Sequence, residues 1–132
     1  MGEGSEMRKE KIKTFEERAD AFLDTAWYNF QNKRYDLAAF NIEQAVQLYV
    51  KTKLLKLTGE FPRTHNLVVL LKELSSVFKE KEVEEFIKNE IESLTKMADI
   101  YITSRYYDRE FYKEEVENLF NFAKKIKELL SD

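Results

Sequence analysis

The sequence has 132 residues, of which 43% are hydrophobic and 36% are charged. This length favours one domain that buries its own core, and the hydrophobic content is too high for a disordered chain. The formal net charge of −3 excludes a protein that is basic over its whole surface and binds nucleic acid in that way. Because there is no Cys and one His, disulfide frameworks, thiolate catalysis and Cys- or His-rich metal sites are excluded. We therefore expect neither a metal nor a cofactor.

No apolar run approaches the roughly 18 residues that a membrane span requires, and no signal peptide opens the chain. These absences predict a cytoplasmic protein with no membrane partner. Residues 1–8 contain two glycines and few apolar side chains, and they predict a flexible tail before a single helical domain, residues 9–132. The first helix is expected from Thr14, which is followed by Glu17 in a capping-box pattern.

A second helix is predicted from Asp36 to Leu57 and ends before Gly59, a residue that readily takes the left-handed conformation of helix ends. It is apolar on two sides, which indicates a helix in the middle of a bundle. Pro62 then favours an extended turn, and a short third helix is predicted with Thr64 as its N-cap.

One long helix is predicted across residues 83–101, followed by a loop over residues 104–111 and a last helix over residues 116–130. Phe122 and Leu129 lie off the apolar stripe of this last helix, and they indicate either isolated exposed residues or a self-association face. No segment alternates with the period of a strand. The predicted fold is therefore all-α, an up-and-down antiparallel bundle of about five helices, four long and one short.

Basic residues gather near the end of the second predicted helix, at Lys51, Lys53, Lys56 and Arg63, with Glu60 as the acidic residue among them. Lysines at a helix C-terminus often complement the helix dipole. The alternative is the rim of an anion-binding site.

Arg63, Thr64 and His65 form the first polar cluster that could carry chemistry. His65 is expected on the first turn of the third helix. The free backbone N–H groups of that turn would keep its imidazole neutral, and they would also favour binding of an anion. A neutral imidazole beside Arg63 could bind phosphate or accept a proton. The alternative is a histidine that caps the helix or holds the loop in place.

Arg105, Tyr106 and Asp108 form the second cluster, just before the last helix. The guanidinium can bind a phosphate through two parallel hydrogen bonds, and the phenol ring can stack on a base. The alternative is a surface pair between Arg105 and Asp108, with the tyrosine packed at the end of the bundle.

The order of these segments resembles the HEPN (higher eukaryotes and prokaryotes nucleotide-binding) domain family. The resemblance covers residues 15–130 and rests on Ala38–Ala45, on Gly59, on Thr64-His65-Asn66-Leu67 and on Ser104-Arg105-Tyr106. It implies a five-helix bundle, usually a homodimer, encoded beside a minimal nucleotidyltransferase. It also implies nucleotide binding or, in many members, RNA cleavage by the toxin of a toxin–antitoxin pair. The ligand-binding positions that it carries over are Lys53, Thr64, His65, Arg105 and Tyr106.

Ribonucleases of that family carry an Arg, then four to six residues, then a His. Here Glu110, Phe111 and Tyr112 stand where that His would follow Arg105. Without the imidazole, RNA cleavage loses a proton-transfer group of the kind that contributes about 10²–10⁴-fold to a rate. We therefore expect a non-catalytic module that binds a nucleotide or an RNA phosphate, with Lys53, Arg63, Thr64, His65, Arg105, Tyr106 and Asp108 as its binding residues.

Two alternatives stay open. One is a metal-independent ribonuclease in which His65 is the catalytic residue, and the other is a bundle that only binds a partner protein, such as the nucleotidyltransferase.

Overall fold

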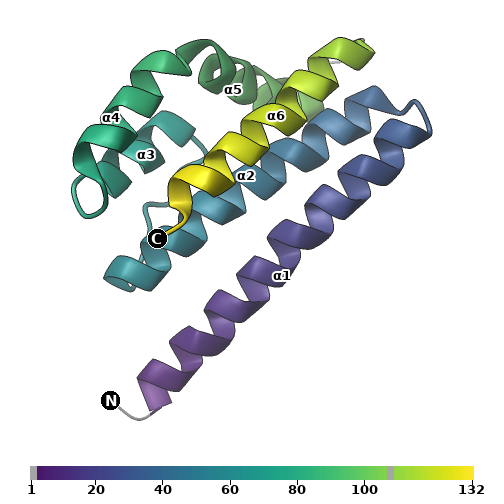
Figure 1. Cartoon of the computed structure of the whole chain (residues 1–132). Coiled ribbons are helices and arrows are strands. Elements are labelled where there is room, and N and C mark those ends of the chain that lie inside the picture. The colour runs from purple at the N-terminus through teal and green to yellow at the C-terminus, as the bar shows by residue number, and fades with distance from the viewer. Residues whose placement is uncertain (1–2, 107–108) are drawn as a thin grey trace.

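Six α-helices make up the ordered elements of the computed structural model, which describes the backbone of residues 3–106 and 109–132 and the side chains of residues 6–103 and 109–132. The helices are α1 (Glu3–Gln31), α2 (Tyr35–Thr58), α3 (Leu67–Ser75), α4 (Glu80–Asn89), α5 (Ile91–Tyr106) and α6 (Lys113–Leu130) (Figure 1). No strand occurs in these ranges, and the predicted all-α class is confirmed.

α2 lies at the centre of the bundle, in contact with α1, α3, α5 and α6. Figure 1 shows α1 running antiparallel to α2, while α6 lies beside α2 on the other side and ends near its C-terminal half. Ala38, Ile42, Val46 and Val50 are fully buried along α2. The two apolar sides of this helix are therefore both covered by neighbouring helices, as its sequence pattern predicts.

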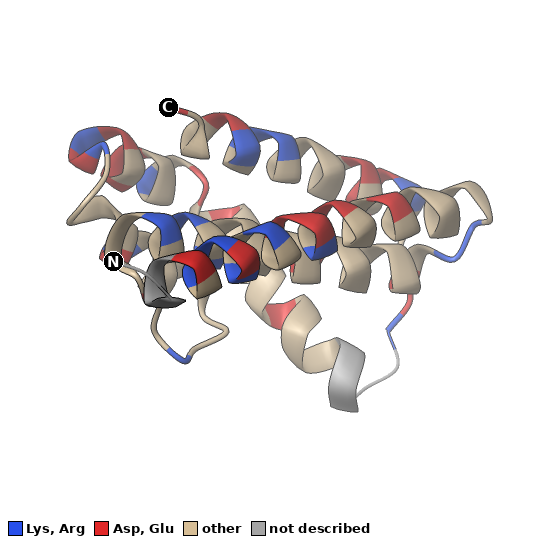
Figure 2. Cartoon of the chain, turned by 90° about the horizontal axis from the view of Figure 1, so that it is seen from below, with Lys and Arg blue, Asp and Glu red and all other residues tan. Residues whose placement is uncertain are grey.

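α1 begins at Glu3, well before the predicted start at Thr14, so the predicted tail is helical from Glu3 onward. Charged residues of both signs are spread along it (Figure 2). The side chain of Arg8 lies against Gly59 at the end of α2, where an added Cβ would come within 3.0 Å of Arg8 Cζ. This contact joins the start of α1 to the end of α2, and no local sequence pattern predicts it.

The single helix predicted across residues 83–101 is two helices, α4 and α5, which meet at Glu90. The backbone of Glu90 leaves the helical conformation, with φ −109° and ψ 24°. Its carboxylate accepts a hydrogen bond from Lys125 Nζ of α6 at 2.7 Å. There is neither Gly nor Pro at this point, so the sequence contains no signal for the break.

Phe122 belongs to the core and is 2% exposed. Its ring packs against Phe86 of α4, with the ring centroids 5.9 Å apart. Leu129 is half-buried and packs against the same core. Both alternatives expected for these two residues, isolated exposure and a self-association face, are therefore wrong. Within the described helices, none has both the length and the apolar character of a membrane span.

Candidate functional site

The connection between α2 and α3, residues 59–66, carries the first predicted cluster. α2 ends at Gly59, which takes a positive φ of 87° and donates its N–H to the carbonyl of Leu55 at 2.9 Å. Further along, the N–H of Thr64 donates to the carbonyl of Pro62 at 3.0 Å, which closes a tight turn. These backbone bonds give the connection a defined course between the two helices.

Asn66 is the N-cap of α3, because its side-chain oxygen accepts hydrogen bonds from the N–H groups of Val68 and Val69 at 2.9 and 3.2 Å. The prediction of Thr64 as the N-cap is wrong, since the Thr64 hydroxyl accepts from the N–H of Asn66 at 3.1 Å. His65 therefore precedes the cap and does not lie on the first turn of α3. The helix amides that were expected to favour an anion beside His65 are used by Asn66.

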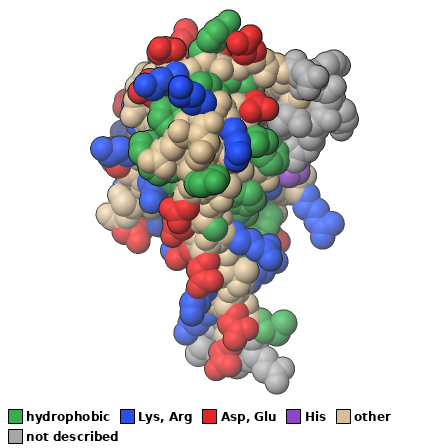
Figure 3. All heavy atoms as spheres, turned by 90° about the vertical axis from the view of Figure 1, so that its right-hand side faces the viewer, with side chains coloured by type: hydrophobic (Ala, Val, Ile, Leu, Met, Phe, Trp, Pro, Cys, Tyr) green, Lys and Arg blue, Asp and Glu red, His purple; other side chains and the backbone are tan. Residues whose placement is uncertain are grey.

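His65 is exposed, and its ring stacks on the ring of Tyr101 in α5 with centroids 4.4 Å apart and 21° between the planes. Figure 3, in which histidine is purple, shows an imidazole at the surface. The His65 carbonyl accepts a hydrogen bond from the side chain of Gln47 on α2. The histidine thus ties the connection to α2 through its backbone and to α5 through its ring.

Two buried polar residues of α2, Glu43 and Gln47, were not among the predicted site residues, and Gln47 contacts the backbone of this histidine. Glu43 is fully buried one turn before Gln47, and its carboxylate accepts a hydrogen bond from Gln44 at 2.8 Å. Burial lowers the pKa of Lys51, and the negative charge of Glu43 opposes that shift. The available signal was the pair Glu43 and Gln47, two polar residues four positions apart on a helix that is otherwise apolar on two sides.

Arg105 stands one turn after Tyr101, about 6 Å further along α5. This part of the predicted loop is helical, because α5 continues to Tyr106. The stacking of His65 on Tyr101 therefore places the backbone of Arg105 near the His65 connection. The side chains of Arg105 and Tyr106, and Asp108 as a whole, lie outside the described residues.

Lys53 makes its contacts with other parts of the chain. Its Nζ donates to the carboxylate of Asp132, beyond the end of α6, at 2.7 Å. The same atom lies 4.5 Å from the ring centroid of Phe78, between α3 and α4. The structure therefore groups Arg63 and His65 with the end of α5, and it places Lys53 beside the last residues of the chain.

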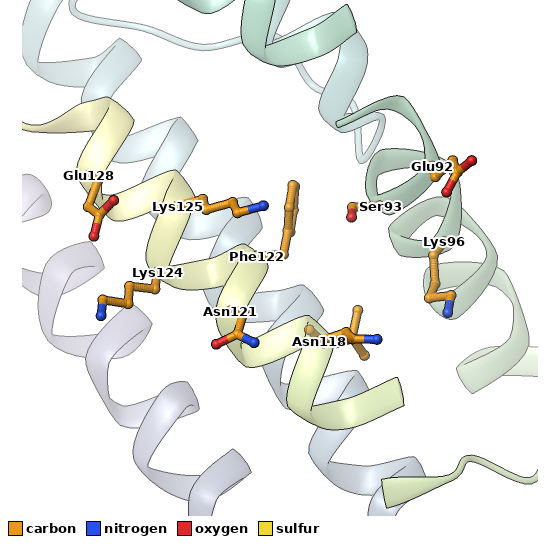
Figure 4. A pocket seen from close by; sticks show the side chains of 10 residues that line it. Glu92, Ser93, Lys96, Asn118, Asn121, Phe122, Lys124, Lys125 and Glu128 are labelled. Carbon is orange, nitrogen blue, oxygen red and sulfur yellow. The ribbon is translucent and has the colours of Figure 1, made fainter. Parts of the chain in front are cut away.

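A groove of about 570 Å³ runs between α5 and α6 (Figure 4). Two of the basic residues that line it already form ion pairs, Lys96 with Glu115 at 3.5 Å and Lys125 with Glu90 at 2.7 Å. These pairs satisfy both ammonium groups, so the groove is less suited to an anionic ligand than the exposed cluster at His65.

Comparison with known proteins identifies the family. A family model described as HEPN domain matches residues 12–132, nearly the whole chain. The chain belongs to the HEPN domain family. No curated protein and no solved structure matches it. Membership of this family suggests a function related to nucleotides or RNA, and it confirms the resemblance that the sequence motifs indicate.

In this HEPN domain, other side chains stand at the positions where a ribonuclease would carry histidine, and one of them packs in the core. Phe111 is 8% exposed and packs in the core, with the Arg109 guanidinium 4.0 Å from its ring centroid. Tyr112 precedes α6, and its N–H donates to the carboxylate of Glu115 at 3.2 Å. The third position, Glu110, is exposed and carries no imidazole.

Proposed function

We propose that this HEPN domain is a non-catalytic module that binds a nucleotide or an RNA phosphate through the surface formed by the His65 connection and the end of α5. The observation that carries the proposal is the stacking of His65 on Tyr101 at 4.4 Å. It joins the connection that carries Arg63 and His65 to α5, one turn before Arg105.

The chemistry of this surface fits a nucleotide ligand. His65 is exposed and stacks on Tyr101, and an imidazole N–H is a donor that suits a phosphate oxygen. Arg63 is exposed two residues earlier and adds a guanidinium, the side chain best suited to phosphate. Arg105 adds a second guanidinium, and Tyr106 a ring on which a base can stack. Thr64 has no part in this proposal, because its hydroxyl accepts the N–H of Asn66 within the connection. Lys53 is left out because its ammonium group contacts Asp132, and Asp108 lies outside the described residues.

Binding of a fluorescently labelled single-stranded RNA and of labelled nucleotides, measured by anisotropy, tests the proposal. We expect the double variant His65→Ala/Arg105→Ala to lose at least about tenfold in affinity, as two charge-assisted or polar contacts are removed. Lys124→Ala is the matched control, because it removes one positive charge from the exposed face of α6 and leaves the His65 connection intact. Equal binding by the wild type and the double variant would contradict the proposal.

Incubation of the same RNA without metal distinguishes this proposal from a ribonuclease. We expect intact RNA, because the histidine on which the family's ribonucleases depend is replaced. Cleavage that disappears in His65→Ala would instead assign His65 a catalytic role.

A homodimer and a minimal nucleotidyltransferase partner, as in a toxin–antitoxin pair, complete the proposal, and both follow from the resemblance to the family. Light scattering on the purified chain should give twice the mass of one chain. Co-expression with a minimal nucleotidyltransferase, where the neighbouring gene encodes one, should yield a complex that survives size-exclusion chromatography. A monomer that binds neither RNA nor nucleotide, yet forms that complex, would favour the role of a bundle that only binds its partner protein.

A further inference from the structure

A cavity of about 560 Å³ between α1 and α2 has no part in the proposed function. Six side chains line it, four from one face of α1 and two from α2: Arg18, Ala21, Phe22, Thr25, Gln44 and Leu48. The α1 residues recur at intervals of three and four, so they share one face of that helix. The volume lies within the roughly 300–1,000 Å³ that is usual for small-molecule sites.

The apolar part of this cavity is separate from the core. Phe22 and Leu48 are half-buried, and within the described residues neither belongs to the hydrophobic core nor packs against it. Ala21, between them and the solvent-exposed side of α1, is exposed and adds little bulk. Apolar surface on both helices is therefore accessible to a ligand, and covering it would be favourable.

Arg18 is the charged residue among the six, and its side chain is exposed. No ion pair engages it in the part of the chain that the structure describes. Glu17 is its neighbour in sequence, but adjacent positions on a helix do not face each other. The residues one turn away on α1, which do face it, carry no carboxylate: Thr14, Phe15, Ala21 and Phe22.

Other carboxylates of this region are engaged elsewhere or buried. Glu16 pairs with Lys56 at 2.6 Å, and both Glu16 and Asp20 line a different cavity, beside α6. Glu43 on α2 is fully buried and accepts the amide of Gln44 at 2.8 Å. The cavity between α1 and α2 therefore presents one positive charge beside an apolar wall.

We propose that this cavity binds a small apolar carboxylate, with the carboxylate on Arg18 and the apolar body between Phe22 and Leu48. A guanidinium can bind a carboxylate through two parallel hydrogen bonds. One charge at the end of an apolar body matches this lining, whereas a nucleotide brings several phosphate charges and a polar base. A second copy packed here about a two-fold axis would present the same Arg18 and place like charges together. The inference goes beyond the proposed function and does not depend on it.

Isothermal titration with decanoate, below its critical micelle concentration, tests the proposal. The α1 wall from Arg18 to Thr25 is about 10 Å long, which suits a medium-chain fatty acid as the probe. We expect saturable binding of one decanoate per chain, and at least about tenfold weaker binding of decylamine, which has the same chain and the opposite charge. Arg18→Gln should bind decanoate about three- to tenfold more weakly, while Lys124→Gln, an exposed charge on α6, should bind like the wild type.

Ala21→Trp tests the position of the ligand, because it places an indole in the cavity from an exposed site. We expect decanoate binding at least about tenfold weaker, whereas Ala98→Trp, at an exposed alanine of α5, should bind like the wild type. Thermal unfolding shows that each variant keeps the fold, and the comparison of decanoate with decylamine requires no variant.

Three results would overturn the inference: no decanoate binding by the wild type, equal affinity for decanoate and decylamine, or equal affinity of Ala21→Trp and the wild type. The double variant His65→Ala/Arg105→Ala should bind decanoate as the wild type does. Binding that is lost in that double variant and kept in Ala21→Trp would place the carboxylate at the His65 surface and contradict the site between α1 and α2.

Discussion

The ring of His65 lies 4.4 Å from the ring of Tyr101, nearly parallel to it, across 36 positions of sequence (101 − 65). This contact links the connection between α2 and α3 to the last turns of α5. A loop histidine held in this way has a restricted ring plane, which a ligand does not have to impose on binding.

Replacement of Tyr101 by Leu should therefore reduce both stability and ligand affinity. The loss of the aromatic pair is expected to cost about 0.5–1.5 kcal/mol of unfolding free energy beyond the change in buried area. RNA affinity should fall further than it does in Lys124→Ala, because His65 loses the ring that orients it. Urea denaturation and anisotropy give the two values.

Tyr101→Phe serves as the control for this contact, since it keeps the ring on which His65 stacks. RNA binding by Tyr101→Phe should be closer to that of the wild type than to that of Tyr101→Leu. If both variants bind RNA as well as the wild type, the stacking has no part in ligand binding.

The start of α3 gives a second prediction, which separates two neighbouring residues. Asn66→Ala should lower the unfolding free energy by about 1 kcal/mol, because two helix N–H groups lose their acceptor. Thr64→Ala removes one hydrogen bond to an exposed backbone N–H and should cost less. Asn66→Asp retains an acceptor and should be close to the wild type. A larger effect of Thr64→Ala would show that the cap is misassigned.

The central position of α2 could be predicted from the sequence because a helix with two apolar sides has to be covered on both. The break at Glu90 could not, since the segment keeps the helical period on either side and contains neither Gly nor Pro. No local pattern marks the start of α1 at Glu3 either, and Arg8 in its first turns lies against Gly59 of α2. Local propensity does not report such contacts.

The residue types of the candidate site and their order along the chain could be predicted from the sequence. Which of these residues lie close together in space could not. Residue type marked His65 as a site residue, whereas no sequence pattern paired it with Tyr101. Lys53 belongs by sequence to the same basic group as Arg63, yet its ammonium group contacts Asp132, 79 positions away. The loop that each lysine contacts depends on the path of the whole chain. The spacing of residues within a short segment of sequence does not determine it.

Gly59 supports a third prediction, in which two sources of strain can be separated. Gly59→Ala should destabilise the fold by at least about 1–2 kcal/mol, because its φ of 87° lies in the left-handed region and the new Cβ meets Arg8. Because the Arg8 guanidinium ends a flexible side chain and can move aside, the double variant Arg8→Ala/Gly59→Ala should recover only a small part of this loss, and the backbone part should remain. The double-mutant cycle, measured by urea denaturation, gives each part. Wild-type stability in Gly59→Ala would contradict this conformation of Gly59.

Glu115, near the start of α6, makes stability dependent on pH. Burial raises the pKa of Glu115, but the hydrogen bonds from the Tyr112 N–H and from Arg109, together with the charges of Arg109 and Lys96, outweigh it and lower the pKa below the ordinary 4.5. The folded state therefore binds this proton more weakly than the unfolded state does. The stabilisation is fully present above about pH 4.5 and is lost as the pH falls through the lowered pKa of the folded state.

Thermal unfolding between pH 7 and pH 3 should thus show a smaller decrease in melting temperature for Glu115→Gln than for the wild type. The variant should already be less stable at pH 7, because Arg109 loses its carboxylate partner at 2.8 Å. Glu117→Gln, an exposed neighbour on the same helix, is the matched control and should follow the pH dependence of the wild type. If Glu115→Gln and the wild type lose the same stability between these pH values, the acid sensitivity of the fold arises from other carboxylates and the contact with Arg109 contributes nothing to it.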